Sequence, residues 1–288
     1  VILSPENIIC FQIRFGRRIQ SVSDFLPDIR VCTVKSTHDI FPCTQGSAVL
    51  KFCQSGCSAS QKRNKIGFFF LHKSTQMRKF VTHREGQVIS RHIPYPVHFE
   101  NDANSAAIAE LKGRDRNAVY LSLSNTVGGS IYLDNDIYGG DHFRSAEFGH
   151  MIIYPEGKPC YCGKRGCADP YCSARVLSSF VGEDGGLGEF FQLLVNKDRD
   201  AAAVWDTYLE DLSIVITNLR MCFDCDIVLG GYVGGYLRPY MSQLGRKVMV
   251  HNKFDNDTLY MKNCSYEKEA SAVGIAMTFM DEYFRTMI

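Results

Sequence analysis

One histidine and three cysteines at fixed spacing constrain this chain more than any other feature. The pattern is His-x9-Cys-x-Cys-x4-Cys. Its members are His150, Cys160, Cys162 and Cys167. Three thiolates and one imidazole complete the tetrahedral shell of Zn²⁺, so no position is left for a catalytic water. Gly163 and Gly166 supply the tight turns that such a short loop needs. We therefore expect a structural zinc site at these four residues, which we call the zinc knuckle.

Chain length and cysteine spacing favour metal binding over disulfides. The chain has 288 residues and 12 cysteines. Disulfide frameworks are typical of small secreted domains, but here four cysteines, including Cys172, fall within a short stretch of a large chain that shows no signal-peptide pattern. We expect Cys172 to be a small core residue. No apolar run approaches the ~18 residues that cross a bilayer, so we expect a cytoplasmic protein without membrane contact.

The charge is unevenly distributed along the chain. The formal net charge is +1, but residues 1–80 hold 12 lysines and arginines against 4 acidic residues. A basic segment can indicate contact with nucleic acid. These basic residues are scattered without helical phase, which weakens that interpretation.

Residues 1–80 differ in pattern from the rest of the chain. No apolar periodicity persists there, so we assign no element to this stretch. From about Ile93 onward, strands and helices alternate, which indicates an α/β protein. We expect an N-terminal lobe at 1–112, and a second lobe at 113–288 that carries the zinc knuckle and a C-terminal helix.

The ordered part predicts a definite series of elements. We expect strands at 97–99, 118–123 and 227–229, helices at 103–111, 201–223 and 266–287, and a hairpin with its turn at 124–129 and its returning arm at 130–138. The strand at 227–229 should end at Gly230 and Gly231, since a glycine pair interrupts strands.

Three motifs, in this order, resemble the ROK family of sugar kinases and sugar-responsive transcriptional repressors. They are Glu100-Asn101-Asp102-Ala103-Asn104, Glu147-Phe148-Gly149-His150 and the run Cys160-Tyr161-Cys162-Gly163-Lys164-Arg165-Gly166-Cys167. The resemblance extends from Ile93 to the C-terminus. It implies an actin/hexokinase-like (ribonuclease H-like) fold of two α/β lobes around a sugar cleft, here with an atypical or incomplete N-terminal lobe. It also implies a homodimer.

The resemblance implies roles at the sugar site. Asp102 matches the catalytic base, which takes a proton from the sugar hydroxyl as that hydroxyl attacks the γ-phosphate. An aspartate here can also cap the following helix, and both roles are compatible. Sugar-contacting positions are matched by Asn101, Asp102, Glu147, His150 and Asp169. His150 would bind zinc through one ring nitrogen and sugar through the other.

Asp169 stands where the family usually has a glutamate. The aspartate keeps the negative charge, but its side chain is one methylene shorter, so its carboxylate lies farther from the expected sugar. Pro170 also makes the loop more rigid. We therefore expect an altered sugar preference.

The phosphate-binding turns depart from the family pattern. The first, Asp-x-Gly-Gly-Thr, is absent from the sequence, and the second reads Ser124-Asn125-Thr126 instead of Gly-Thr-Gly. Side chains at those positions narrow the approach to phosphate and disfavour positive φ, although this stretch can also be a plain hairpin turn. Nucleotide contacts, weakened by these changes, are implied for Asn125, Thr126, Gly128, Gly230 and Gly231.

Together these features favour the sugar-sensing part of a transcriptional regulator with impaired nucleotide binding. DNA would then be bound only through a missing or separate domain, because we find no helix-turn-helix pattern. The alternative is an ATP-dependent hexose or N-acetylhexosamine kinase that uses Asp102, in which case ATP and Mg²⁺ would be required. A third interpretation is a structural or non-functional protein that binds no sugar.

Overall fold

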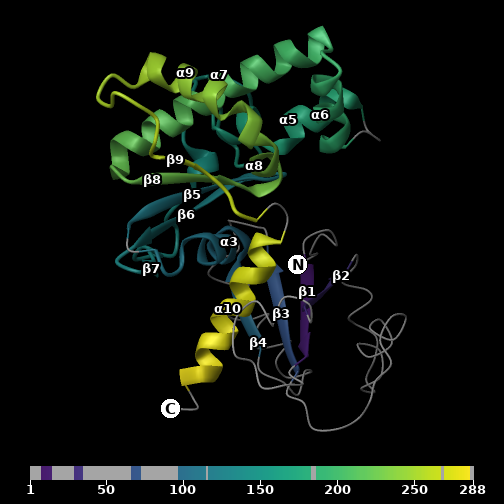
Figure 1. Ribbon diagram of the computed structural model, residues 1–288, viewed down its shortest axis with the longest axis vertical. Helices are drawn as coiled ribbons and strands as arrows, with labels where there is room; N and C mark the ends of the chain where they lie inside the picture. The colour runs from purple at the N-terminus through teal and green to yellow at the C-terminus, as the bar shows by residue number, and fades with distance from the viewer. Residues whose placement is uncertain are drawn as a thin grey trace. The chain divides into compact units, whose positions relative to one another are not determined.

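The computed structural model in Figure 1 divides into two compact units. It describes residues 8–14, 29–34, 66–72, 97–114, 116–182, 186–266 and 269–285. The first unit combines Val1–Ser105 with Ser271–Ile288, and the second spans Ala106–Ala270. Among the described helices, none is both long and apolar enough to cross a membrane.

The first unit contains a four-stranded sheet in the order β2-β1-β3-β4. Its strands are β1 (Ile8–Arg14), β2 (Ile29–Val34), β3 (Ile66–His72) and β4 (Val97–Asn101). β1 pairs antiparallel with β2 and β3, and β3 pairs parallel with β4. Our expectation of no assignable element in residues 1–80 was therefore wrong. Continuous apolar runs such as that of β3 show neither helical nor alternating periodicity, so pairing with distant strands decides their structure.

Two polar contacts organise the junction of β4 with α3 (Asp102–Leu111). The Asn101 Oδ1 atom accepts the backbone N–H groups of Ala103 at 3.0 Å and Asn104 at 3.2 Å, which is the bonding of a helix N-cap. The Ser271 hydroxyl donates to the Asp102 carbonyl at 2.9 Å. This bond ties the start of α10 (Ala270–Arg285) to the first unit, whereas we had expected the C-terminal helix in the second lobe.

The second unit is built on a five-stranded sheet in the order β7-β6-β5-β8-β9. Its strands are β5 (Ala118–Leu123), β6 (Val127–Leu133), β7 (Asp136–Ile137), β8 (Asp226–Gly230) and β9 (Met261–Asn263). β5 pairs antiparallel with β6 and parallel with β8. The strands expected at 118–123 and 227–229 are thus confirmed, with small differences at their ends.

Most helices of this unit lie on one face of the sheet, and α3 packs against the other face (Figure 1). The helices and 3-10 turns are η6 (Phe148–His150), α4 (Asp169–Cys172), α5 (Ala174–Ser178), η7 (Ser179–Val181), α6 (Leu187–Val195), α7 (Arg199–Phe223), α8 (Gly231–Leu237), η8 (Arg238–Tyr240) and α9 (Met241–His251). Successive residues of β5 point to opposite faces, as the pleat requires. Val119 and Leu121 join the large core with α7, while Tyr120 joins a smaller core with Ala107 of α3.

Helix α7 confirms the long amphipathic helix expected at 201–223 and begins two residues earlier. The Asp198 carboxylate caps it by accepting the N–H groups of Asp200 at 3.1 Å and Ala201 at 2.8 Å. The helix ends at Phe223, and the next residue, Asp224, caps it with a left-handed backbone of φ 44°.

The hairpin turn is shorter than we expected, because β6 already begins at Val127. Gly128 and Gly129 therefore belong to the strand, where they pair with Ser122 and Leu121. A Cβ atom on Gly129 would lie 2.1 Å from the Phe148 ring. Glycine is required there for close packing, a long-range reason that the sequence pattern does not reveal.

A buried carboxylate gives a test of this fold. Glu110 of α3 is 4% exposed and accepts the backbone N–H groups of Ser265 and Tyr266, at 2.8 Å each from Oε1. Glu110→Ala leaves two donors without this acceptor, so we expect the free energy of unfolding to fall by about 2 to 4 kcal/mol in urea titrations. Glu110→Gln, which keeps an acceptor oxygen, should lose less. Equal losses in the two variants would contradict the proposed anchoring role.

Candidate functional site

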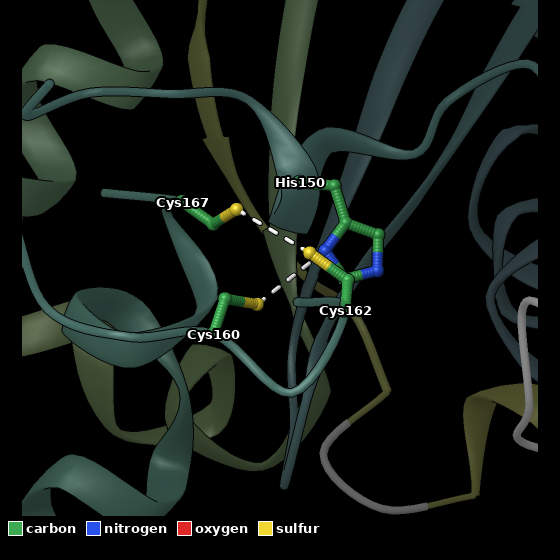
Figure 2. Close-up of side chains that lie close together, drawn as sticks. All are labelled: His150, Cys160, Cys162 and Cys167. Carbon is green, nitrogen blue, oxygen red and sulfur yellow. Dashed lines mark hydrogen bonds between the residues drawn. The ribbon is translucent and has the colours of Figure 1, made fainter. Parts of the chain in front are cut away.

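The structure brings the four zinc-knuckle side chains together (Figure 2). Their ligand atoms all lie within 4.8 Å of one another. The Cys160 Sγ atom is 3.7 Å from His150 Nδ1, and Cys162 Sγ is 3.7 Å from Cys167 Sγ. Tetrahedral Zn²⁺ with bonds of about 2.3 Å to sulfur places two thiolates about 3.8 Å apart, so the donor set fits such an ion.

Backbone bonds shape the loop that carries the three cysteines. The Cys160 N–H donates to the Lys164 carbonyl at 2.8 Å, and the Gly163 N–H donates to the Cys160 carbonyl at 3.0 Å. Gly166 has φ +76°, and a Cβ there would lie 1.7 Å from the Tyr154 carbonyl oxygen. Only glycine meets both conditions at this position, as the sequence analysis expected of the loop.

The protonation preferences of the four zinc-knuckle side chains differ, and only those of Cys162 and His150 favour the form that binds a metal ion. Burial raises the pKa of Cys160 to about 12 and also raises that of Cys167. Burial opposes ionisation of Cys162 too, but the backbone N–H of Lys164 and the neighbouring thiols bring its pKa below the usual range. Burial lowers the pKa of His150, which favours the neutral imidazole that binds metals. A cation at this place would favour the thiolates and offset the cost of burying them.

His150 Nε2, the nitrogen that faces away from the thiols, contacts Tyr161. The Tyr161 hydroxyl lies 3.3 Å from Nε2, and the two rings pack edge to face with centroids 5.1 Å apart. Tyr161 is 60% exposed, so its ring is open to solvent beside the histidine. We did not single out this residue from the sequence. Its place between two metal-binding cysteines was the available signal.

Asp169 connects the zinc knuckle to the turn between β5 and β6. It is 7% exposed, and its Oδ1 atom accepts the Val127 N–H at 2.6 Å. Burial raises the pKa of Asp169, although the Val127 N–H favours the carboxylate. The Ala174 N–H donates to the Ser124 carbonyl at 2.8 Å on the other side of the turn. The turn is therefore held at both ends.

The turn itself needs no glycine. Asn125 and Thr126 lie in a three-residue bend, and no residue of 124–126 has a positive φ. Residues 124–126 thus connect the two strands of a β-hairpin, and a contact of Asn125 and Thr126 with nucleotide stays a prediction. Gly128, expected to contact nucleotide from the turn, lies in β6 instead.

Gly230 and Gly231 lie against this turn. Gly231 has φ +76°, and a Cβ there would lie 2.7 Å from the Ser124 Oγ atom. Its N–H donates to the Tyr120 hydroxyl at 3.2 Å. A Cβ on Gly230 would lie 2.2 Å from the same hydroxyl. The structure thus brings the two turns expected at the nucleotide together, with one tyrosine packed beneath the glycines.

The residues expected at the sugar are divided between the two units. Asn101 and Asp102 lie at the start of α3 in the first unit. Glu147, His150 and Asp169 lie in the second, where Glu147 immediately precedes η6. Within the second unit, Asp169 is close enough to His150 to influence its pKa. That all five residues contact one sugar stays a prediction.

Comparison with known proteins identifies similar chains. The model of the ROK family matches residues 85–282. The N-acetylmannosamine kinase of Vibrio cholerae is 32% identical over 154 residues, which cover 49% of this chain and 53% of that protein. The chain therefore spans about half the length of the curated relatives it matches.

Solved structures show the same fold. The ROK hexokinase from Thermus thermophilus superimposes with a TM-score of 0.58 at 24% identity, covering 68% of this chain and 70% of that one. A ROK family transcriptional regulator, a homologue of the E. coli MLC protein, gives a TM-score of 0.53 at 21% identity, with 67% and 55% covered. These likenesses confirm the actin/hexokinase-like α/β fold expected from the sequence.

A cysteine substitution tests the zinc knuckle. Cys162→Ser removes one of three thiolate ligands, so we expect zinc content measured by atomic emission to fall from about one ion per chain to near zero. The melting temperature should fall as well. Cys222→Ser, at an exposed cysteine of α7, is the matched control and should keep the metal. Unchanged zinc in Cys162→Ser would contradict the assignment.

Proposed function

The chain belongs to the ROK family, and we propose that it is a sugar-binding member, the carbohydrate-sensing part of a transcriptional regulator with impaired nucleotide binding. The names of its relatives point to the sugar class, because they include kinases of N-acetylmannosamine and a hexokinase. The zinc knuckle would hold the loop of Glu147 and His150 still. Carboxylate and imidazole groups could then form the directional hydrogen bonds that sugar hydroxyls require.

The observation that carries the proposal is that two backbone N–H groups beside the expected phosphate turns already have acceptors within the chain. The Val127 N–H already donates to the Asp169 carboxylate, and the Gly231 N–H already donates to the Tyr120 hydroxyl. Phosphate binding by backbone turns depends on such donors pointing at the ligand. A carboxylate at one of them also repels an anion. Both features support weak nucleotide binding.

A second candidate is an ATP-dependent sugar kinase with Asp102 as the base. The cap geometry is compatible with it, because the Asn101 Oδ1 atom accepts the N–H groups of Ala103 and Asn104 and so supplies an N-cap for α3. Asp102 does accept the N–H of the next residue, Ala103, at 2.9 Å. In this candidate Asp102 would orient the sugar hydroxyl and take its proton, and ATP with Mg²⁺ would supply the phosphoryl group.

Calorimetric titration distinguishes the candidates. We expect a hexose or N-acetylhexosamine to release binding heat, and a non-hydrolysable ATP analogue to give none, with or without sugar. Nucleotide heat together with ATP-dependent turnover in a coupled assay would instead establish the kinase. If no sugar in the panel gives heat or a thermal shift, the sugar-binding proposal is wrong and a structural role stands.

Substitutions at two neighbouring residues distinguish a role in capping α3 from a role as catalytic base. Asn101→Ala removes the cap of α3, so we expect the free energy of unfolding to fall by about 1 kcal/mol. Asp102→Asn should keep the melting temperature, and should reduce any kinase turnover more than sugar affinity. A loss of melting temperature in Asp102→Asn as large as that in Asn101→Ala would mean that Asp102 is chiefly a capping residue.

A further inference from the structure

A buried carboxylate joins two segments that lie 42 residues apart in the sequence. From its contacts we propose that Asp169 is a positioning residue, through which the zinc knuckle holds the 124–126 turn in place. Metal binding at the zinc knuckle and order in the turn are then coupled. The inference rests on the proposed metal site, and it does not require sugar binding or phosphoryl transfer.

The first step is the bond between Asp169 and Val127. The Oδ1 to N distance is 2.6 Å, and the aspartate is 7% exposed. A carboxylate that accepts a backbone N–H away from water makes a strong, charge-assisted bond. Val127 is the first residue of β6, so this bond fixes where the turn ends and the strand begins.

The second step is the other end of the turn. The Ser124 carbonyl accepts the N–H of Ala174, the first residue of α5, at 2.8 Å. Asp169 and Ala174 bound one short segment that contains α4. This segment is therefore hydrogen-bonded to both ends of the turn, to Val127 through the Asp169 side chain and to Ser124 through the Ala174 backbone.

The third step is the link from this segment to the zinc knuckle. Cys167 precedes Asp169 by two residues and forms a β-bridge with Ile152. The Ala168 N–H donates to the Met151 carbonyl at 2.8 Å, directly after His150. The segment from Asp169 to Ala174 thus follows directly on Cys167 and Ala168, which are paired with the residues next to His150. Freeing Cys167 and His150 from a shared ion would loosen the backbone that aims the Asp169 carboxylate at Val127.

Hydrogen exchange at the Val127 amide tests this coupling. In the zinc-loaded protein we expect Asp169→Ala to raise the exchange rate of Val127 by about tenfold, since the amide loses its acceptor. Asp169→Asn keeps an acceptor oxygen and should rescue the protection. Removing zinc with a chelator should raise Val127 exchange in the parent protein, but should add little in Asp169→Ala.

Asp198→Ala is the matched control, because Asp198 is also a carboxylate that accepts backbone N–H groups in the second unit. It should lower stability without changing Val127 exchange. Full protection of Val127 in folded Asp169→Ala, failure of Asp169→Asn to restore it, or an equal chelator effect in the parent and in Asp169→Ala would each overturn the proposal. These hydrogen-exchange measurements are made without sugar. A failure of the sugar-binding proposal would appear only in the calorimetric titrations, so the two failures can be distinguished.

Discussion

The loop from His150 to Cys167 is arranged around four donor atoms that are gathered in a small space. Three thiols and an imidazole form only weak hydrogen bonds with one another at these distances. Burial also opposes ionisation of Cys160 and Cys167. A divalent cation reverses that preference, because it binds the thiolate form. The loop between His150 and Cys167 is already anchored by Met151, Ile153 and Tyr154, which pack against the core, and an ion would add a cross-link between its two ends. The bridge between Ile152 and Cys167 and the close approach of Gly166 to the Tyr154 carbonyl belong to the same loop.

In the second unit, the turns expected at phosphate and the loop expected at sugar lie at neighbouring places on one sheet. The β5–β6 turn and the glycine turn after β8 meet at one end of the strands, where backbone donors could bind phosphate. Both donors described there already have partners within the chain. The loop with Glu147 and His150 packs beside the same turn, since Gly149 lies against the Val127 carbonyl. The proposed sugar contacts of Glu147 and His150 and the backbone donors of Val127 and Gly231 are different atoms, so the proposal allows the first to be kept while the second are occupied.

The sequence predicted what depends on local spacing. The grouping of the zinc-knuckle side chains, the helix at 199–223 and the strand before Gly230 follow from short-range patterns, and the structure contains them. Long-range features were missed or wrong. The strands in residues 1–80 depend on pairing, the start of β6 depends on a ring from another segment, and the contact of Tyr161 with His150 arises only when the loop closes.

The hydroxyl group of Tyr120 is the acceptor for the Gly231 N–H group. Its ring fills the space beneath Gly230, while its hydroxyl alone reaches the Gly231 amide. A phenylalanine would preserve the packing and expose the amide, so a single oxygen atom distinguishes the two states. The oxygen atom, and not the framework of the sheet, therefore determines whether the Gly231 amide is available to another acceptor.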